Sequence, residues 1–167
     1  MDIKSFKKKI YMLTHIDKKG NAKIVDVSEK KITQRSATSS GKIFVSKKII
    51  NAIKENSNKK GDILTVSKIA GIMGAKKTSD LIPLCHPLKL ENISIDYNIN
   101  ENKKFIEVTT KVKCNEKTGV EMEAITATSI CLLTIYDMCK ALDSKMIISD
   151  IKLLKKYGGK KTIINNF

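Results

Sequence analysis

Four charged side chains stand out in the apolar segment 119–141: Glu121, Glu123, Asp137 and Lys140. Carboxylates and amines exchange protons, and charged groups on a buried helix need partners. Asp137 and Lys140 are three residues apart, which places them on one face of a helix. Glu123 and Asp137 point in similar directions but lie roughly 21 Å apart along the helix axis. Either they contact different ends of a large ligand, or another subunit completes each site.

A histidine between two prolines is the second candidate. The chain has two prolines and two histidines, and His86 lies between Pro83 and Pro87. Proline fixes its own φ and moves the preceding residue away from helical backbone. We therefore expect a stiff, extended turn over residues 80–88 that holds the imidazole in place. A helix-to-strand connector with an incidental histidine is an equally weighted interpretation.

Several cations could hold an anion. Lys60 precedes a glycine at an expected helix start, where the helix dipole favours negative charge. Arg35 is the one arginine among 32 basic residues, and arginine offers a planar, bidentate donor to phosphate or carboxylate. Lys76 and Lys77 form a basic pair at the end of the same helix. The alternatives are a solvated turn for Lys60, a structural salt bridge for Arg35 and a solvated surface for the Lys76-Lys77 pair.

Structural roles also compete for the acids. Thr118 and Glu121 have the spacing of a helix capping box, and Asp137 with Lys140 could be a surface pair. The sequence shows no serine-nucleophile motif, P-loop, Rossmann glycine pattern or metal-ligand cluster. The residues alone thus indicate an enzyme that performs acid–base chemistry on a phosphorylated compound.

The composition limits the class of protein. The chain has 167 residues, 41% of them hydrophobic, and a formal net charge of +15, which predicts one globular domain with an affinity for polyanions. Lysine-rich coding bias is the other explanation of that charge. The four cysteines form no CxxC pair, so we expect a reduced, cytoplasmic protein without a zinc site. No apolar run predicts a membrane span or secretory signal, although the basic N-terminus leaves organellar targeting open.

The expected elements position these residues in one α+β domain. Residues 1–11 are predicted to be a flexible basic leader, 12–161 a single catalytic domain and 162–167 a tail. Residues 33–40 are predicted to be a mobile loop and 41–45 a strand. Helices are expected over 46–60 and from Asp62, a hairpin over 93–114, a long helix over 119–141, and a final strand over 146–154 before a loose basic segment 157–161. This order predicts a ferredoxin-like sandwich, an antiparallel sheet with helices on one face.

Several long motifs in this order resemble one known family. They are Lys60-Gly61-Asp62, Ile69-Ala70-Gly71-Ile72, Ala75-Lys76-Lys77-Thr78, the run Asp80–Leu88, Lys117–Ala124 and Leu133–Ala141. Shorter matches are Thr14-His15, Val25-Asp26-Val27-Ser28, Thr33-Gln34-Arg35 and Gly158-Gly159-Lys160. Over residues 12 to 161 the chain resembles the molybdenum cofactor biosynthesis protein C family, the cyclic pyranopterin monophosphate synthases.

The resemblance implies a lyase reaction. Such enzymes convert 3′,8-cyclo-7,8-dihydroguanosine 5′-triphosphate into cyclic pyranopterin monophosphate and pyrophosphate by general acid–base catalysis. It implies a homohexamer, a trimer of dimers with active sites at subunit interfaces. It implies no required cofactor, although Mg²⁺ could accompany the triphosphate, and no nucleic-acid or membrane partner.

The resemblance also implies roles for site residues. Asp137, Lys140 and Lys60 correspond to catalytic residues, and no metal ligands are implied. Substrate-binding residues are Leu84, Cys85, His86, Glu121, Met122, Glu123, Arg35 and Lys76, the last two toward the triphosphate. His86 could bind phosphate or relay a proton.

The chain departs from the family in three places, none of them a proposed catalytic residue. Residue 24 is Ile where Met is usual, residues 36–40 are richer in hydroxyls, and residues 158–162 read Gly-Gly-Lys-Lys-Thr. Two other functions compete with this one. A basic RNA-binding module would need exposed sheet aromatics, for which Tyr97 and Phe105 are the main candidates. A catalytically silent assembly subunit is disfavoured by the intact Lys60, Asp137 and Lys140.

Overall fold

The computed structural model describes residues 14–17, 19–55, 61–159 and 162–165. Its strands are β1 (Thr33–Phe44), β2 (Leu90–Asn100), β3 (Phe105–Glu116), β4 (Ile147–Tyr157) and β5 (Ile163–Ile164). Its helices are α1 (Lys47–Lys54), α2 (Ile63–Lys76), α3 (Thr78–Leu81) and α4 (Glu121–Cys139). The predicted leader 1–11 lies outside the described residues.

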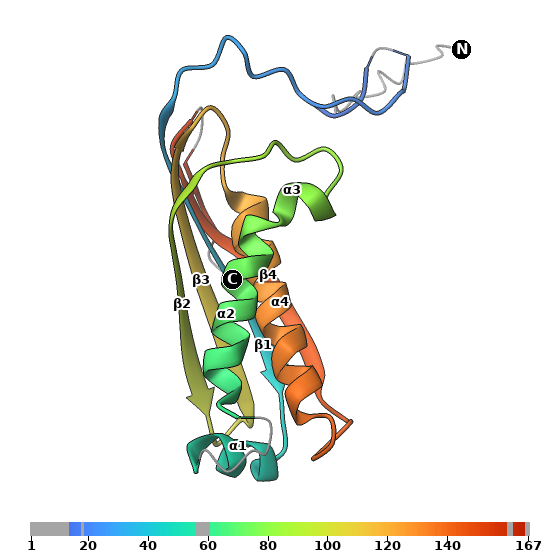
Figure 1. Cartoon of the computed structure of the whole chain (residues 1–167), viewed down its shortest axis with the longest axis vertical. Helices are drawn as coiled ribbons and strands as arrows, with labels where there is room; N and C mark the ends of the chain where they lie inside the picture. The colour runs from blue at the N-terminus through green and yellow to red at the C-terminus, as the bar shows by residue number, and fades with distance from the viewer. Residues whose placement is uncertain (1–13, 18, 56–60, 160–161, 166–167) are drawn as a thin grey trace, which may run out of the picture.

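The strands form one antiparallel sheet in the order β2-β3-β1-β4-β5. Figure 1 shows α2 and α4 side by side across one face of this sheet. The predicted ferredoxin-like α+β sandwich is therefore confirmed. The hairpin and the final strand are confirmed too, while α3 and the short β5 were not predicted.

The core lies between the sheet and α4. Ile43 and Val108 face inward from neighbouring strands and are fully buried against Leu132 and Ile135 of α4. Among the described residues α4 alone has the length and hydropathy of a membrane span, with about half of it buried within the fold. Burial in this core accounts for much of its apolar composition.

Two glycines let α2 approach α4 closely. A Cβ on Gly71 would lie 2.3 Å from the Cys131 sulfur and 3.1 Å from the Ala127 carbonyl oxygen. A Cβ on Gly74 would lie 2.8 Å from the Ile130 side chain. The close packing predicted from these glycines is confirmed.

The predicted mobile loop at 33–40 is wrong, because these residues form the first two thirds of β1. The segment pairs with both β3 and β4. Ser39 can be fully buried because its hydroxyl has partners: Ser39 Oγ donates to the Ala124 carbonyl at 2.7 Å and lies 2.5 Å from Thr128 Oγ1. Thr128 in turn donates to Thr110 Oγ1 at 3.0 Å. A hydroxyl-rich segment can thus be an interior strand when its hydroxyls bond one another.

The helix starts follow the sequence only in part. Asp62 accepts hydrogen bonds from the backbone of Leu64 and Thr65, so the predicted cap of α2 is confirmed. Ser46 occupies the N-cap of α1 but makes no side-chain cap bond. The predicted capping box of α4 is wrong: its N-cap is Val120, which offers no side-chain acceptor.

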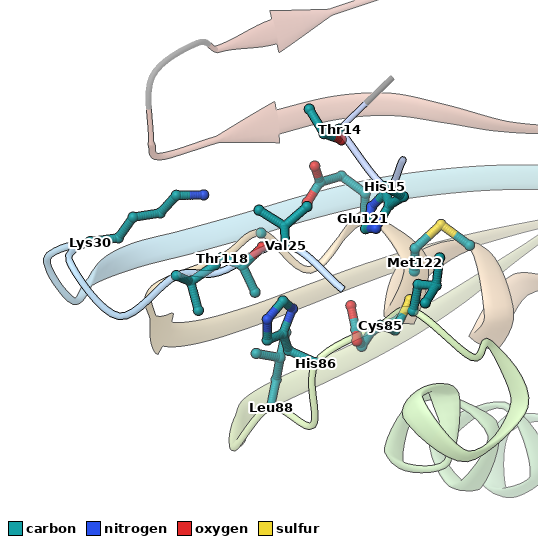
Figure 2. Close-up of a pocket in the computed structure, with 14 residues that line it drawn as sticks. Thr14, His15, Val25, Lys30, Cys85, His86, Leu88, Thr118, Glu121 and Met122 are labelled. Atoms are coloured by element: carbon teal, nitrogen blue, oxygen red, sulfur yellow. The ribbon is translucent and has the colours of Figure 1, made fainter. Parts of the chain in front are cut away.

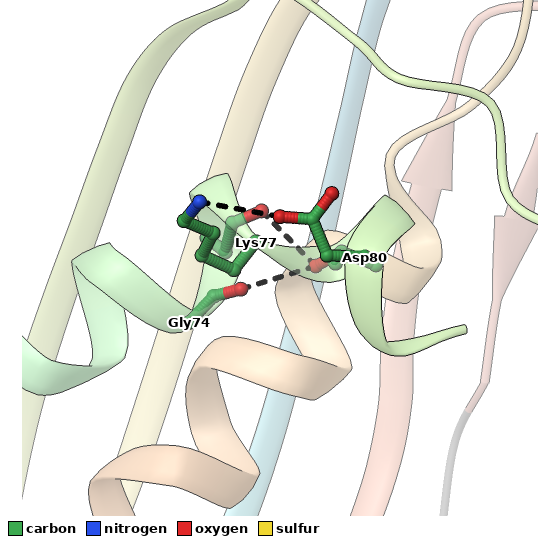
Figure 3. A network of polar contacts seen from close by, with 5 residues as sticks. Gly74, Lys77 and Asp80 are labelled. Carbon is green, nitrogen blue, oxygen red and sulfur yellow. Dashed lines mark hydrogen bonds and ion pairs between the residues drawn. The ribbon is translucent and has the colours of Figure 1, made fainter. Parts of the chain in front are cut away.

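A short polar junction joins α2 to α3. Lys77 Nζ lies 3.2 Å from a carboxylate oxygen of Asp80 (Figure 3). The Asp80 amide donates to the Lys77 carbonyl at 3.0 Å. The Lys77 amide donates to the Gly74 carbonyl at 3.1 Å. This turn ends the helical run and directs the chain into the proline-flanked loop.

The predicted loose segment after the final strand is also wrong for its described part. Tyr157 belongs to β4, and Gly158 and Gly159 have positive φ and pack directly on Arg35. A Cβ on Gly158 would lie 2.3 Å from the Gln34 carbonyl oxygen, so no side chain fits there. The end of β4 is therefore tied to the start of β1.

Candidate functional site

A cavity of about 320 Å³ lies where three segments meet: the loop 82–88, the first turn of α4 and the N-terminal segment 14–30 (Figure 2). Six predicted substrate-binding residues line it. They are Leu84, Cys85, His86, Glu121, Met122 and Glu123. Two groups of residues far apart in the sequence are thus brought together as predicted. We call this cavity the acidic pocket.

The proline-flanked loop has the expected extended form. Ile82 adopts φ −112° and ψ 106°, and the Cys85 amide closes a turn onto the Ile82 carbonyl at 3.1 Å. His86 projects from this loop into the pocket (Figure 2). Rigid backbone on both sides of the imidazole restricts where it can move.

The two glutamates of the pocket have different environments. Glu123 is 4% exposed, and burial raises the pKa of its carboxyl to about 7, with a further contribution from the charge of Glu121. Glu121 instead forms an ion pair with Lys156 of β4. One carboxyl is therefore poised to exchange a proton near neutral pH, while its neighbour is held in an ion pair.

The thiol of the pocket is not activated. Burial raises the pKa of Cys85, and the charges of Glu123 and Glu121 raise it further. A thiol in this setting stays protonated at neutral pH, which disfavours a nucleophilic role. Cys85 therefore contributes shape and a weak donor.

A second cavity of about 680 Å³ adjoins the acidic pocket and is cationic. The two share Lys30, Thr118 and Gly119 as lining residues. Among the residues that the structure describes, its lining includes the basic residues Lys30, Lys31, Arg35, Lys117 and Lys156 and no acidic residue. We call it the basic cavity, and its charge suits a phosphate chain.

Arg35 lines the basic cavity with its guanidinium already engaged. Its Nε donates to the Glu116 carbonyl at 3.2 Å and one terminal nitrogen donates to the Lys117 carbonyl at 3.3 Å. The sequence left open a phosphate contact or a salt bridge; the structure shows bonds to backbone carbonyls instead. Arg35 thus fixes the loop that leads into α4 and also lines the basic cavity.

Asp26 has a loop-building role. Its Oδ1 accepts from the Ser28 amide and hydroxyl at 2.8 and 2.6 Å, and these bonds hold the pKa of the carboxyl below its usual range. Lys117 Nζ donates to the Ser28 carbonyl at 2.8 Å. These contacts fasten the N-terminal segment against the loop before α4.

The predicted catalytic pair lies elsewhere in the same chain. Lys140 Nζ is 2.7 Å from Asp137 Oδ1, and both side chains are more than half exposed. This hydrogen bond raises the pKa of Lys140, so the ammonium keeps its proton. The pair lies toward the other end of α4 from Glu123, roughly 21 Å along the axis.

Two further predicted residues are Lys76 and Lys60. Lys76 is exposed at the end of α2 and lines neither cavity. Lys60 lies outside the described residues. The described structure of a single chain therefore gathers the predicted substrate-binding residues other than Lys76 and leaves Asp137 and Lys140 apart from them.

Sequence reasoning missed several cavity residues. Lys156 is placed opposite Glu121 by the register of β4, and Lys30 and Lys117 reach the basic cavity from loops. Lysines are too common in this chain for any one to stand out. His15 belongs to the matched pair Thr14-His15 but is not among the predicted site residues.

The sheet gives little support for the RNA-binding alternative. The Tyr97 hydroxyl lies 2.7 Å from Ser67 Oγ on the helix side, and Phe105 is 8% exposed. Neither predicted aromatic is free to stack a base. Among the described residues, no group of three or more His, Cys, Asp and Glu could hold a metal ion.

Fold and site together define a ferredoxin-like protein with a proton-exchanging pocket beside a cationic cavity. A family model described as the MoaC family matches residues 24–159. The chain belongs to the MoaC family, as the motifs predicted.

Curated relatives agree over nearly the whole domain. A cyclic pyranopterin monophosphate synthase from Clostridium botulinum is 55% identical over 146 residues, which is 87% of this chain and 92% of the relative. The synthase from Heliobacterium modesticaldum is 49% identical over 148 residues, which is 89% of this chain and 93% of the relative. The Caenorhabditis elegans molybdenum cofactor biosynthesis protein moc-5 is 50% identical over 153 residues, 91% of this chain but 25% of that longer protein.

Proposed function

We propose that this chain is a cyclic pyranopterin monophosphate synthase. It converts 3′,8-cyclo-7,8-dihydroguanosine 5′-triphosphate to cyclic pyranopterin monophosphate and pyrophosphate, a step of molybdenum cofactor biosynthesis. Relatives of that name share about half of its residues over most of its length. The single observation that carries the proposal is the placement of the acidic pocket directly beside the basic cavity.

The two cavities suit the two halves of this substrate. The fused ring system would occupy the acidic pocket, where Glu121, Glu123 and His86 can bond its nitrogens and oxygens. The triphosphate would extend past Thr118 and Gly119 into the basic cavity. There the lysines and Arg35 would offset the charge of the departing pyrophosphate.

Acid–base catalysis needs groups that change protonation during ring opening and reclosure. Glu123 is suited to give and take a proton near pH 7. Asp137, Lys140 and Lys60 remain the proposed catalytic set, with Lys140 acting as a proton donor while it is paired with Asp137. Lysines from a neighbouring chain would be needed to lower its pKa.

Self-association would bring the separated groups into one site. Val66, Ile69 and Met73 form an exposed apolar strip on α2, and Leu133 of α4 is also exposed. Exposed apolar patches of this kind commonly mark interfaces. A homohexamer built as a trimer of dimers would cover apolar surface and could place Asp137 and Lys140 of one chain at the acidic pocket of another.

The proposal includes no resident cofactor. Mg²⁺ would arrive with the triphosphate and be held mainly by phosphate oxygens, as Mg²⁺ commonly is. The location would be cytoplasmic, which suits four free cysteines.

Incubation with the cyclised dihydro-GTP tests the reaction. Formation of the pyranopterin and of pyrophosphate would be followed together, since the proposal requires equal amounts of each. An Arg35→Ala variant should lose at least tenfold in kcat/KM, because the loop before α4 loses two anchors. Well-folded wild-type protein without turnover would contradict the proposal.

A further inference from the structure

The N-terminal segment builds a small hairpin that fixes one histidine. Asp17 Oδ1 accepts from the Lys19 and Asn21 amides at 2.8 and 2.9 Å. The Lys23 amide donates to the His15 carbonyl at 2.9 Å, and Ile16 bridges to Ala22. His15 is therefore held by a closed hydrogen-bonded turn.

The segment that follows this hairpin runs along the acidic pocket. Val25, Val27 and Lys30 line the cavity, and the Lys117 bond to the Ser28 carbonyl anchors the segment to the loop before α4. The hairpin is thus attached to the domain through residues that are themselves part of the pocket wall.

Both histidines of the chain line the same cavity. Figure 2 shows Thr14 and His15 entering from the N-terminal segment near Glu121, on the side away from His86. Among the residues that the structure describes, none forms a hydrogen bond with the His15 imidazole. Its ring nitrogens can therefore meet a bound molecule.

We propose that His15 is a further substrate-contacting residue, whose imidazole hydrogen-bonds a polar group of the ligand on the side opposite His86. The hairpin 14–23 is then one wall of the binding site rather than a passive extension. The identity of the ligand rests on the proposed function. The pocket then has one imidazole on each side, with Glu121 near His15.

Substitutions separate hydrogen bonding from packing. His15→Phe keeps a ring without a donor or acceptor, and His15→Gln keeps a polar terminus. Losing one such bond should raise KM about fivefold in His15→Phe and in His15→Ala, with kcat within about twofold of wild type. His15→Gln should recover most of the affinity. Lys19→Ala alters the same hairpin outside the pocket and should leave KM unchanged.

Imidazole NMR supplies a readout that a purely structural role would not move. With two histidines, histidine-labelled protein gives two sets of ring signals, which His86→Asn assigns. In an Asp137→Asn background, which stops turnover, the cyclised dihydro-GTP should shift the His15 signals as well as those of His86. Shifts confined to the His86 signals would overturn the inference. So would a wild-type KM in His15→Phe together with a raised KM in His15→Gln. Turnover by the wild-type protein would leave the proposed function intact in either case. Absence of wild-type turnover would overturn the proposed function itself.

Discussion

Lys140 Nζ lies 2.7 Å from Asp137 Oδ1, toward the opposite end of α4 from the buried carboxyl of Glu123. An exposed pair of this kind contributes little to stability, so stability alone does not explain it. Its exposure is what catalysis in a neighbouring chain's site would require.

Removing either partner should therefore separate activity from stability. Asp137→Asn and Lys140→Ala should each abolish turnover, lowering kcat by at least about a hundredfold through loss of a proton-transfer group. The melting temperature and the molecular mass in solution should stay as in wild type. Lys54→Ala, which removes the comparably exposed pair with Glu101, is the matched control and should keep full activity. Dissociation of the Asp137 or Lys140 variants into monomers would favour a structural ion pair instead.

Glu123 makes stability depend on pH. Its folded pKa of about 7 lies above the ordinary value of 4.5, so the folded state holds its proton more tightly than the unfolded state does. Stability is then greatest below the unfolded value and falls as pH rises toward 7. Glu123→Gln should be more stable than wild type at pH 8, by about 3 kcal/mol, and equal to it below about pH 4.5.

Chemical denaturation of both proteins from pH 4 to 9 measures that difference directly. Glu107→Gln removes the same charge from the other face of the sheet. Glu107 points away from the core, because its neighbours Ile106 and Val108 in β3 point into it. This variant should show no such growing difference. If the difference in unfolding free energy between wild type and Glu123→Gln stayed constant from pH 4 to 9, a raised pKa of Glu123 would be contradicted.

Gly71 is needed where α2 meets α4. A Cβ there would lie 2.3 Å from the Cys131 sulfur and 2.8 Å from the Ile95 side chain, so Gly71→Ala should destabilise the fold by about 2 kcal/mol. Combining it with Cys131→Ala removes the nearest atom and should give a favourable coupling of about 1 kcal/mol in a double-mutant cycle. Strictly additive effects would mean that the helices separate rather than clash.

The buried hydroxyl group of Ser39 anchors β1 to the first turns of α4. Ser39→Ala removes its bonds to the Ala124 carbonyl and to Thr128, and should cost about 1 to 2 kcal/mol of unfolding free energy. Ser36→Ala, in the same strand and on the opposite face, should cost less than about 0.5 kcal/mol. Urea denaturation compares the two, and equal losses would show that the hydroxyl contacts contribute nothing specific.

The sequence predicted most of the fold because its apolar residues follow clear periods. The alternation through Ile95 and Val108 and the cap at Asp62 both placed elements correctly. The loop prediction for residues 33–40 was wrong because a run of short hydroxyl side chains is usually typical of loops. Only the tertiary contact of Ser39 with Thr128 makes that stretch an interior strand.

The candidate site was predictable where a motif was continuous. His86 and Glu123 were found this way, and the structure places both at one cavity. Lys156 was not found, since its pairing with Glu121 depends on the register of β4 after an irregularity near Leu153. Asp137 and Glu123 could be judged too distant for one small pocket from helix geometry alone, and the structure keeps them on one continuous helix.

Subunit complementation tests most directly whether one reaction uses both ends of α4. Glu123→Gln and Asp137→Asn, each with below about one hundredth of wild-type activity, would be coexpressed with different tags and purified as mixed assemblies. If each site takes its pocket from one chain and its Asp137 from another, random mixing leaves about one quarter of the sites intact. The account therefore predicts that turnover of the cyclised dihydro-GTP returns to about a quarter of the wild-type rate. Mixed assemblies as inactive as the separate variants would contradict it.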